Sequence, residues 1–218
     1  DVLRKQMKSS KYKSQQIYIG TVTDPYQPME TKYRITRKAL EVLLEHDNPV
    51  SILTKSDKVL DDIDLLKQFK KVDVNFTVTS LDEKWVRFTE PRAPSVKQRL
   101  AAMKKLSGEG ITVYAMMGPY WPFFTDPEKL FKEFKKAGVK RVFTESFNTT
   151  GGNFTGVENV LKKYSEHLAG MKEILFDSKR FYEFYREAEN KVKHASRKYN
   201  IPTTVYFGLG HAAKFRQS

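Results

Sequence analysis

Three polar residues stand directly after two β-rich runs of the sequence. Lys55 follows "VSILT", and Thr23 and Asp24 follow "IYIGTV". An ammonium group at a strand end can pair with a carboxylate or phosphate, whereas a hydroxyl and a carboxylate suit an ammonium ion. If the two strands are neighbours, Lys55 would bind the carboxylate of a zwitterion, and Thr23 with Asp24 would bind its amine. The pattern predicts an amino-acid-like ligand, although an Asp-Pro turn is an alternative interpretation of Asp24.

Hydroxyl and aromatic side chains follow two further β-rich runs. Thr77 and Ser80 could donate hydrogen bonds to an anionic ligand, or they could satisfy the backbone of a turn. The loop "GPYWPFF" carries Tyr120 and three more aromatic residues. Such rings either stack on a nucleotide base or pack beneath a covering segment, and both interpretations stay open.

Three charged residues are candidates for supporting roles. Glu90 and Arg99, in "TEPRAPSVKQRL", predict a structural ion pair or a clamp on the loop between them. Glu145, at the end of "VFTE", is a carboxylate that could contact a substrate or a ribose hydroxyl.

Six β-rich runs alternate with amphipathic helical patterns, and we expect residues 1–218 to form a single α/β domain. The predicted strands are Ile17–Val22, Val50–Thr54, Val72–Thr79, Ile111–Met117, Val139–Thr144 and Thr203–Phe207. Repeated β-then-α order predicts parallel strands joined by right-handed crossovers, in an open sheet or in a complete or partial barrel. The opening "DVLRKQMKSSKYKSQQ" predicts the end of a helix, so the first βα unit of this chain is expected to be incomplete.

Ligands of such folds bind at the C-terminal ends of the strands. We therefore expect five strand-end loops to surround one site: Thr21–Pro28, Thr54–Asp57, Thr77–Glu83, Met116–Phe124 and Thr144–Asn153.

Composition limits the chemistry of the chain. Its 218 residues include no cysteine, which excludes disulfides, thiolate nucleophiles and cysteine-ligated metal within it, and the four histidines show no metal-ligand spacing. A net charge of +13 favours partners such as DNA or RNA, or it reflects a lysine-rich soluble surface. No apolar run approaches the roughly 20 residues of a membrane span and no signal peptide is evident, so we expect a cytoplasmic protein without a membrane partner.

Three stretches together resemble the radical S-adenosylmethionine enzymes related to spore photoproduct lyase, which are also called DNA repair photolyases. They are "IGTVTDPYQPMETKYRITRKALE", "SILTKSD" and "TEPRAPSVKQRLAAMKKLSGEGI", and the resemblance covers nearly the whole chain in order. It implies a partial (βα)6, TIM-like barrel that binds S-adenosylmethionine beside a [4Fe–4S] cluster. It also implies reductive cleavage of that cofactor to a 5′-deoxyadenosyl radical, which abstracts hydrogen from the substrate.

The resemblance assigns cofactor-binding roles to five residues. Thr23 and Asp24 lie where the family handles the amino group of the methionine part, and Lys55 matches the position that pairs with its carboxylate. Thr77 matches a serine that faces the cofactor. Tyr120 is then a candidate neighbour of the adenine. The resemblance assigns no catalytic residue.

Two departures from the family concern sulfur. The family holds its cluster with three cysteines of a CxxxCxxC loop after the first strand, and this chain contains neither that loop nor that strand. We favour a chain that is a fragment over a degenerate member without radical chemistry, and we expect this polypeptide alone to be inactive. Spore photoproduct lyase also carries a hydrogen-donating cysteine where this sequence has Thr21, which argues against thymine-dimer repair by that mechanism.

The first hypothesis is therefore a radical S-adenosylmethionine enzyme that resembles spore photoproduct lyase, with nucleic acid as a candidate substrate. A second is a non-redox α/β module that binds nucleic acid or nucleotides. A third is a barrel hydrolase or isomerase that uses Glu145 and Lys55 as acid and base. Loss of cofactor binding in Lys55→Ala would support the first hypothesis alone.

Overall fold

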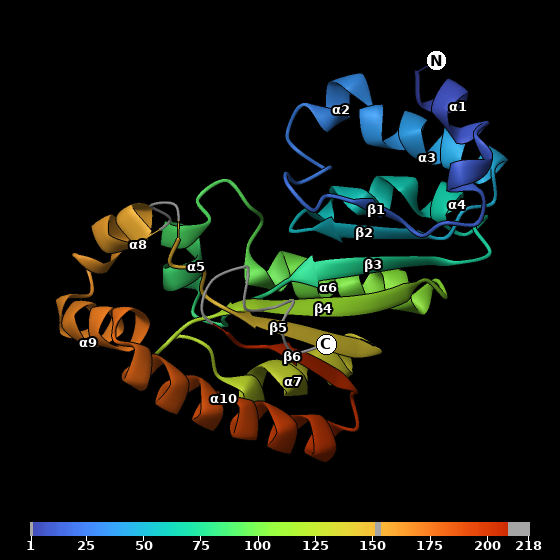
Figure 1. The fold of residues 1–218 in the computed structure, drawn as a ribbon. Helices are drawn as coiled ribbons and strands as arrows, with labels where there is room; N and C mark the ends of the chain where they lie inside the picture. Colours follow the sequence, from blue (N-terminus) through green and yellow to red (C-terminus); the bar gives the residue numbers. More distant parts are fainter. Residues whose placement is uncertain (1, 151–153, 209–218) are drawn as a thin grey trace.

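Six parallel strands form one sheet, and strands that follow one another in the sequence are neighbours in space (Figure 1). A computed structural model describes residues 2–150 and 154–208. The sequence predicted all six strands, with ends that differ by as many as three residues. The strands are β1 (Ile17–Ile19), β2 (Val50–Thr54), β3 (Val72–Thr77), β4 (Thr112–Tyr120), β5 (Arg141–Ser146) and β6 (Thr203–Tyr206).

Helices connect the parallel strands, and α1 precedes β1 as expected. The α-helices are α1 (Val2–Met7), α2 (Glu30–Tyr33), α3 (Ile35–Glu45), α4 (Ile63–Leu66), α5 (Glu83–Thr89), α6 (Val96–Gly108), α7 (Pro127–Lys136), α8 (Phe154–Leu161), α9 (Ser165–Phe176) and α10 (Ser178–Tyr199). Two 3-10 helices span Ser10–Tyr12 and Asp57–Asp62.

Local sequence signals explain where two of these helices begin. Ser95 and Gln98 form the predicted capping box, in which the Ser95 hydroxyl accepts from the Gln98 amide and the Gln98 side chain accepts from the Ser95 amide. The carboxylate of Asp126 caps α7, and Pro127 occupies its first turn. These caps fix the points at which α6 and α7 begin.

Strand side chains alternate between the two faces of the sheet. Val50 and Ile52 of β2 are fully buried against the helices, as is Val74 of β3. Ser51 and Asp73 point to the other face, where the Ser51 hydroxyl donates to the Asp73 carboxylate over 2.6 Å. This period of two is what a sheet covered by helices on one face requires.

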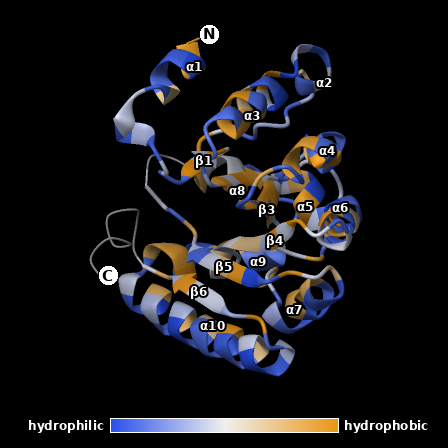
Figure 2. Ribbon diagram, turned by 90° about the vertical axis from the view of Figure 1, so that its right-hand side faces the viewer, coloured by the Kyte–Doolittle hydropathy of each residue, from blue (hydrophilic) through white to orange (hydrophobic). Residues whose placement is uncertain are grey.

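The sheet curves without closing. Figure 2 shows its strands as an arc, with α3, α4, α6 and α7 along one side and α10 below β6. Within the described residues, β1 pairs with β2 alone and β6 with β5 alone. The fold is therefore the predicted α/β partial barrel. None of the described helices is long and apolar enough to cross a membrane.

The end of β1 lies unusually close to β2. Gly20 has a φ of +93°, and a Cβ placed there would lie 2.1 Å from the carbonyl oxygen of Leu53. Only glycine fits such a left-handed conformation at this separation. The close approach brings the loop that follows β1 against the end of β2.

Candidate functional site

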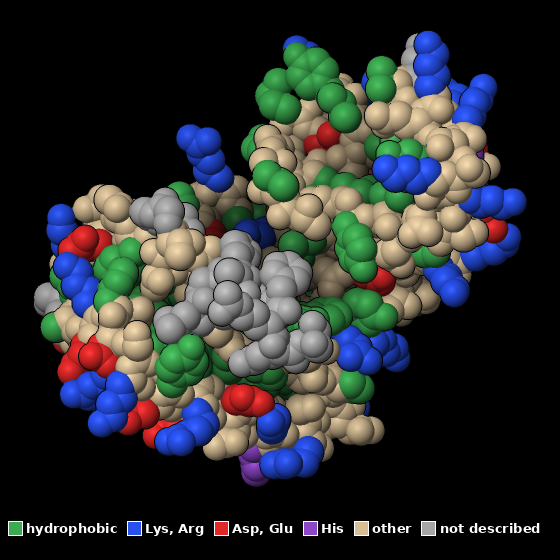
Figure 3. Space-filling view, viewed as in Figure 1, with side chains coloured by type: hydrophobic (Ala, Val, Ile, Leu, Met, Phe, Trp, Pro, Cys, Tyr) green, Lys and Arg blue, Asp and Glu red, His purple; other side chains and the backbone are tan. Residues whose placement is uncertain are grey.

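A cleft of about 820 Å³ opens at the C-terminal ends of the first strands. Its walls come from three segments: residues 24–28 after β1, residues 55–58 after β2, and residues 89–94 between α5 and α6. The space-filling view shows the surface hollowed between the α2 and α5 sides of the molecule, with a basic side chain deep inside (Figure 3). This location is the one that ligands of parallel α/β folds use.

Asp24 joins the loop after β1 to the end of β2. One carboxylate oxygen accepts from the backbone amide of Tyr26 over 2.9 Å and from the Thr54 hydroxyl over 2.7 Å. The other oxygen accepts from the backbone amide of Lys55 over 2.7 Å. The Asp-Pro turn interpretation is therefore correct, and the same carboxylate also lines the cleft.

Lys55 faces a buried ion pair across the cleft. Its Nζ lies 3.9 Å from Oε1 of Glu90, and Oε2 of Glu90 lies 2.5 Å from an Nη of Arg99. The Lys55 side chain is 38% exposed, whereas Arg99 is completely buried. The predicted Glu90–Arg99 ion pair is thus confirmed, and it reaches the cleft through Glu90.

The charges that line the cleft balance. Three acidic and three basic side chains contribute: Asp24, Lys55, Asp57, Lys58, Glu90 and Arg92. A mixed lining of this kind complements a ligand that carries both signs of charge, in contrast to the +13 of the whole chain.

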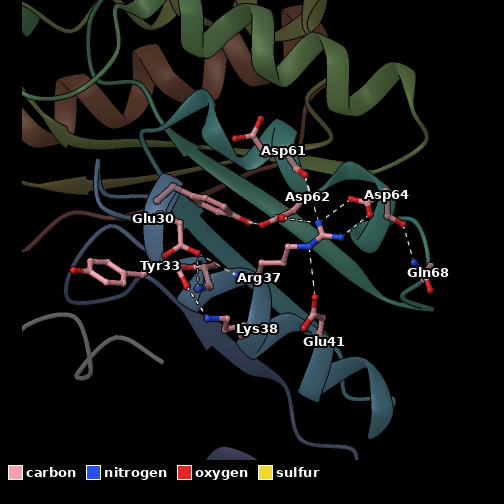
Figure 4. Close-up of polar contacts among 11 residues, drawn as sticks. Glu30, Tyr33, Arg37, Lys38, Glu41, Asp61, Asp62, Asp64 and Gln68 are labelled. Carbon is pink, nitrogen blue, oxygen red and sulfur yellow. Dashed lines mark hydrogen bonds and ion pairs between the residues drawn. The ribbon is translucent and has the colours of Figure 1, made fainter.

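A charged network supports the cleft from behind (Figure 4). The buried Tyr26 donates its hydroxyl to Asp62 over 3.0 Å, and Arg37 pairs with Asp62 at 2.8 Å and with Asp64 at 2.6 Å. Burial and the nearby Asp62 carboxylate raise the pKa of Tyr26 above its ordinary value. The phenol therefore stays neutral and holds the loop after β1 in place.

Two predicted cofactor residues lie beside the cleft without lining it. Thr23 is exposed on the loop after β1, next to Asp24. Thr77 is buried at the end of β3, and its carbonyl accepts from Arg99 over 2.9 Å. The Glu90–Arg99 ion pair therefore links the end of β3 to the cleft.

Tyr120 lies in a different environment, at the end of β4. Its ring contacts those of Phe184, Tyr185 and Phe207, and only 3% of the residue is exposed. Burial raises the pKa of Tyr120 to about 12. The structure does not bring Tyr120 to the cleft, and its contact with an adenine stays a prediction.

Two further residues of the aromatic loop, Trp121 and Phe124, are buried, whereas Phe123 is exposed. Phe124 stacks on Trp85 with ring centroids 3.8 Å apart, and Trp121 and Tyr164 meet the same indole edge to face. Ser80 donates to the carbonyl of Phe124 over 2.6 Å. Of the two interpretations, packing beneath a covering segment is the one that agrees with the positions of Trp121 and Phe124.

The prediction that five loops surround one site was too broad. Two of them, after β1 and β2, line the cleft together with residues 89–94, which the prediction did not include. Part of the fifth loop, residues 151–153, lies outside the described residues. Glu145 lies on β5 and does not line the cleft. The sequence signal for the wall that the prediction omitted was present in "EPRAP", where two prolines and two charged residues follow α5.

A second hollow, of about 460 Å³, opens at the N-terminal ends of the strands. Two of its lysines are already paired, Lys67 with Glu109 and Lys70 with Asp47. Residues 2–150 and 154–208 contain no group of three or more His, Cys, Asp or Glu that could hold a metal ion. The cleft beside Lys55 is therefore the strongest candidate site.

The chain belongs to the radical SAM superfamily. The superfamily profile matches residues 1–126, which include the first four strands and all three cleft walls.

Two relatives match over part of their length. An uncharacterized protein of Methanocaldococcus jannaschii is 37% identical over 119 residues, covering 55% of this chain and 46% of the relative. An uncharacterized protein of Acidianus two-tailed virus is 31% identical over 159 residues, covering 69% of this chain and 52% of the relative. The chain thus spans about half the length of these relatives.

Solved structures share the fold. A variant of spore photoproduct lyase with dinucleoside spore photoproduct matches with a TM-score of 0.67 at 15% identity, covering 94% of this chain and 65% of that one. Streptococcus suis SuiB bound to S-adenosylmethionine matches with a TM-score of 0.55 at 14% identity, covering 87% and 39%. These matches confirm the partial barrel predicted from the sequence.

Proposed function

We propose that the cleft binds the methionine part of S-adenosylmethionine. Lys55 pairs with the carboxylate, while Asp24 and the neighbouring Thr23 receive the amino group. The observation that carries the proposal is the placement of Lys55 and Asp24 on adjoining walls of one charge-balanced cleft at the strand ends. Superfamily membership supports the choice of ligand.

The chain's own residues act in this proposal by binding and orientation. Reductive cleavage of bound S-adenosylmethionine, the chemistry of the superfamily, uses a [4Fe–4S] cluster held by cysteine thiolates. The sequence contains no cysteine, so the residues of this chain do not fit the cluster. Their contribution is to fix the methionine carboxylate and amine, so that the rest of the cofactor has one orientation.

We further propose that the substrate is a nucleic acid. The surplus of 13 positive charges suits a phosphate backbone. A spore photoproduct lyase structure contains a dinucleoside photoproduct, and SuiB has been solved with a precursor peptide. The charge of this chain favours the first class of substrate. Titration with a short DNA duplex and with a neutral peptide of similar mass tests this choice, and preference for the peptide would contradict it.

Equilibrium titration with S-adenosylmethionine tests the cofactor assignment. We expect Lys55→Ala to weaken binding by roughly tenfold or more, because a charge-assisted bond to the carboxylate is lost. Lys104→Ala on the exposed surface of α6 is the matched control and should bind like the wild type. Unchanged binding in Lys55→Ala would contradict the assignment.

A further inference from the structure

Glu90 is held by two cations at very different distances. One oxygen is 2.5 Å from the Arg99 guanidinium, whereas the other is 3.9 Å from the Lys55 ammonium. The first distance is that of a close ion pair, and the second is too long for a hydrogen bond. Glu90 therefore belongs to Arg99, and Lys55 is only loosely attached to it.

Arg99 is fixed independently of Glu90. Its Nε donates to the carbonyl of Pro94 over 2.9 Å, and one Nη donates to the carbonyl of Thr77 over 2.9 Å. The guanidinium is completely buried, with two hydrogen bonds and one ion pair, so its position is set by α6, by the end of β3 and by the loop that precedes α6. The loop carboxylate of Glu90 is consequently held at the edge of the cleft.

This double pairing allows Lys55 to leave Glu90 at small cost. If a ligand carboxylate takes the ammonium of Lys55, Glu90 keeps its guanidinium, so no buried charge is left without a partner. A direct contact of about 2.8 Å with a ligand carboxylate is also stronger than the loose one that it replaces.

We propose that Glu90 is a resident counter-ion of Lys55 that the ligand's carboxylate displaces, and that Arg99 is the positioning residue that holds Glu90 for this exchange. The inference rests on the proposed function and deepens it. Glu90 competes for the Lys55 ammonium only with a ligand that carries a carboxylate, because a ligand without one makes no pair with that ammonium. The exchange thus lowers the affinity for ligands with a carboxylate and leaves the affinity for ligands without one nearly unchanged.

Calorimetric titration with S-adenosylmethionine and with its decarboxylated analogue tests the proposal. Glu90→Gln removes the competing charge and keeps a side chain of the same shape beside Arg99. We expect it to bind S-adenosylmethionine about fivefold more tightly than the wild type does, a modest gain because Lys55 is partly exposed. Affinity for the decarboxylated analogue should change by less than about twofold. Equal strengthening for both ligands, weaker binding or no change would overturn the proposal.

Two controls isolate the role of Glu90. Glu83→Gln removes a nearby carboxylate that accepts from the amide of Lys97 and has no contact with Lys55, and it should leave both affinities unchanged. In a Lys55→Gln background, Glu90→Gln should have no effect on affinity. An effect that persists without Lys55 would show that Glu90 does not act through it.

A structure of the wild type with bound S-adenosylmethionine needs no variant. We expect the Lys55 ammonium on the ligand carboxylate and Glu90 still on Arg99, and an unchanged Lys55–Glu90 contact would overturn the exchange. If the wild type binds S-adenosylmethionine through Lys55 but Glu90→Gln fails these tests, the counter-ion role alone is wrong. If the wild type does not bind it at all, both proposals are wrong.

Discussion

The C-terminal edge of the sheet has two halves that differ in their side chains. At the ends of β1 and β2, charged side chains surround an open cleft of about 820 Å³. At the ends of β4 and β5, aromatic rings fill the corresponding space, and Trp121 and Phe147 lie with centroids 4.8 Å apart. The strand order is equally regular in both halves, so side-chain composition decides which strand ends remain open.

The aromatic half and the charged half of this edge are suited to different roles. Aromatic rings bury large areas and give rigidity, whereas a cleft of charged groups keeps its side chains available to a ligand. The buried Arg99 stands at the border, since it bonds to the end of β3 and to a cleft wall. Variants of the two halves should therefore differ in whether stability or ligand affinity changes.

The largest expected effect is on stability, in the aromatic half. Trp121→Ala leaves a cavity among Trp85 and Phe147, and we expect the free energy of unfolding to fall by about 4 kcal/mol. Urea denaturation measures this fall, and Trp121→Phe should show a smaller one. Affinity of the folded protein for S-adenosylmethionine should be unchanged. A loss of affinity as large as in Lys55→Ala would show that the halves are not separate.

A variant at the border should change both properties. Arg99→Met leaves Glu90 without its guanidinium, and we expect the free energy of unfolding to fall by about 3 kcal/mol. Affinity for S-adenosylmethionine should fall too, because Glu90 then has only Lys55 as a partner. The exposed Arg87→Met on α5 is the control and should stay within about 0.5 kcal/mol of the wild type. Normal affinity in Arg99→Met would confine Arg99 to a structural role.

A smaller effect is expected from one hydroxyl under the aromatic half. The buried Tyr185 hydroxyl donates to the carbonyl of Tyr120 over 3.0 Å and accepts from the amide of Phe147 over 3.1 Å. Tyr185→Phe leaves both backbone groups without this partner, so we expect a loss of about 1–2 kcal/mol in the free energy of unfolding. The exposed Tyr182→Phe is the matched control. Equal stability of the two variants would mean that the hydroxyl contributes nothing.

The smallest effect concerns pH and lies away from both regions. Burial raises the pKa of Asp73, although hydrogen bonds from Ser51 and Asn75 oppose the rise. Because the folded protein then binds this proton more tightly than the unfolded chain does, Asp73 should reduce stability as pH rises above about 4. Thermal unfolding between pH 4 and pH 7 should show a smaller decline in Asp73→Asn than in the wild type. An identical decline in both proteins would count against this assignment.

The strands could be predicted from the sequence, whereas the cleft could be predicted only in part. The six strands and the caps at Ser95 and Asp126 follow from local patterns, and the structure has all of them. The pairing of Glu90 with Arg99 was also predictable, because both flank one short loop. That this loop forms a cleft wall depends on how α5 and α6 pack, which no local pattern contains.

For the aromatic loop, the sequence could not decide between two interpretations. The rings of Tyr120 and the three aromatic residues after it are equally suited to stacking on a ligand and to filling a core, and the choice depends on whether a distant segment covers them. Tyr164, more than forty residues later, supplies part of that cover. Periodicity and motif spacing could not reveal this contact.

The close approach of β1 to β2 has a consequence for evolution. At Gly20, any side chain would collide with the backbone of Leu53, so mutations there should be eliminated by selection. The next three residues, 21–23, are exposed and should drift far more freely unless a ligand constrains them. The boundary between an invariant and a variable position thus falls between Gly20 and Thr21, inside the short segment that leads to the cleft aspartate.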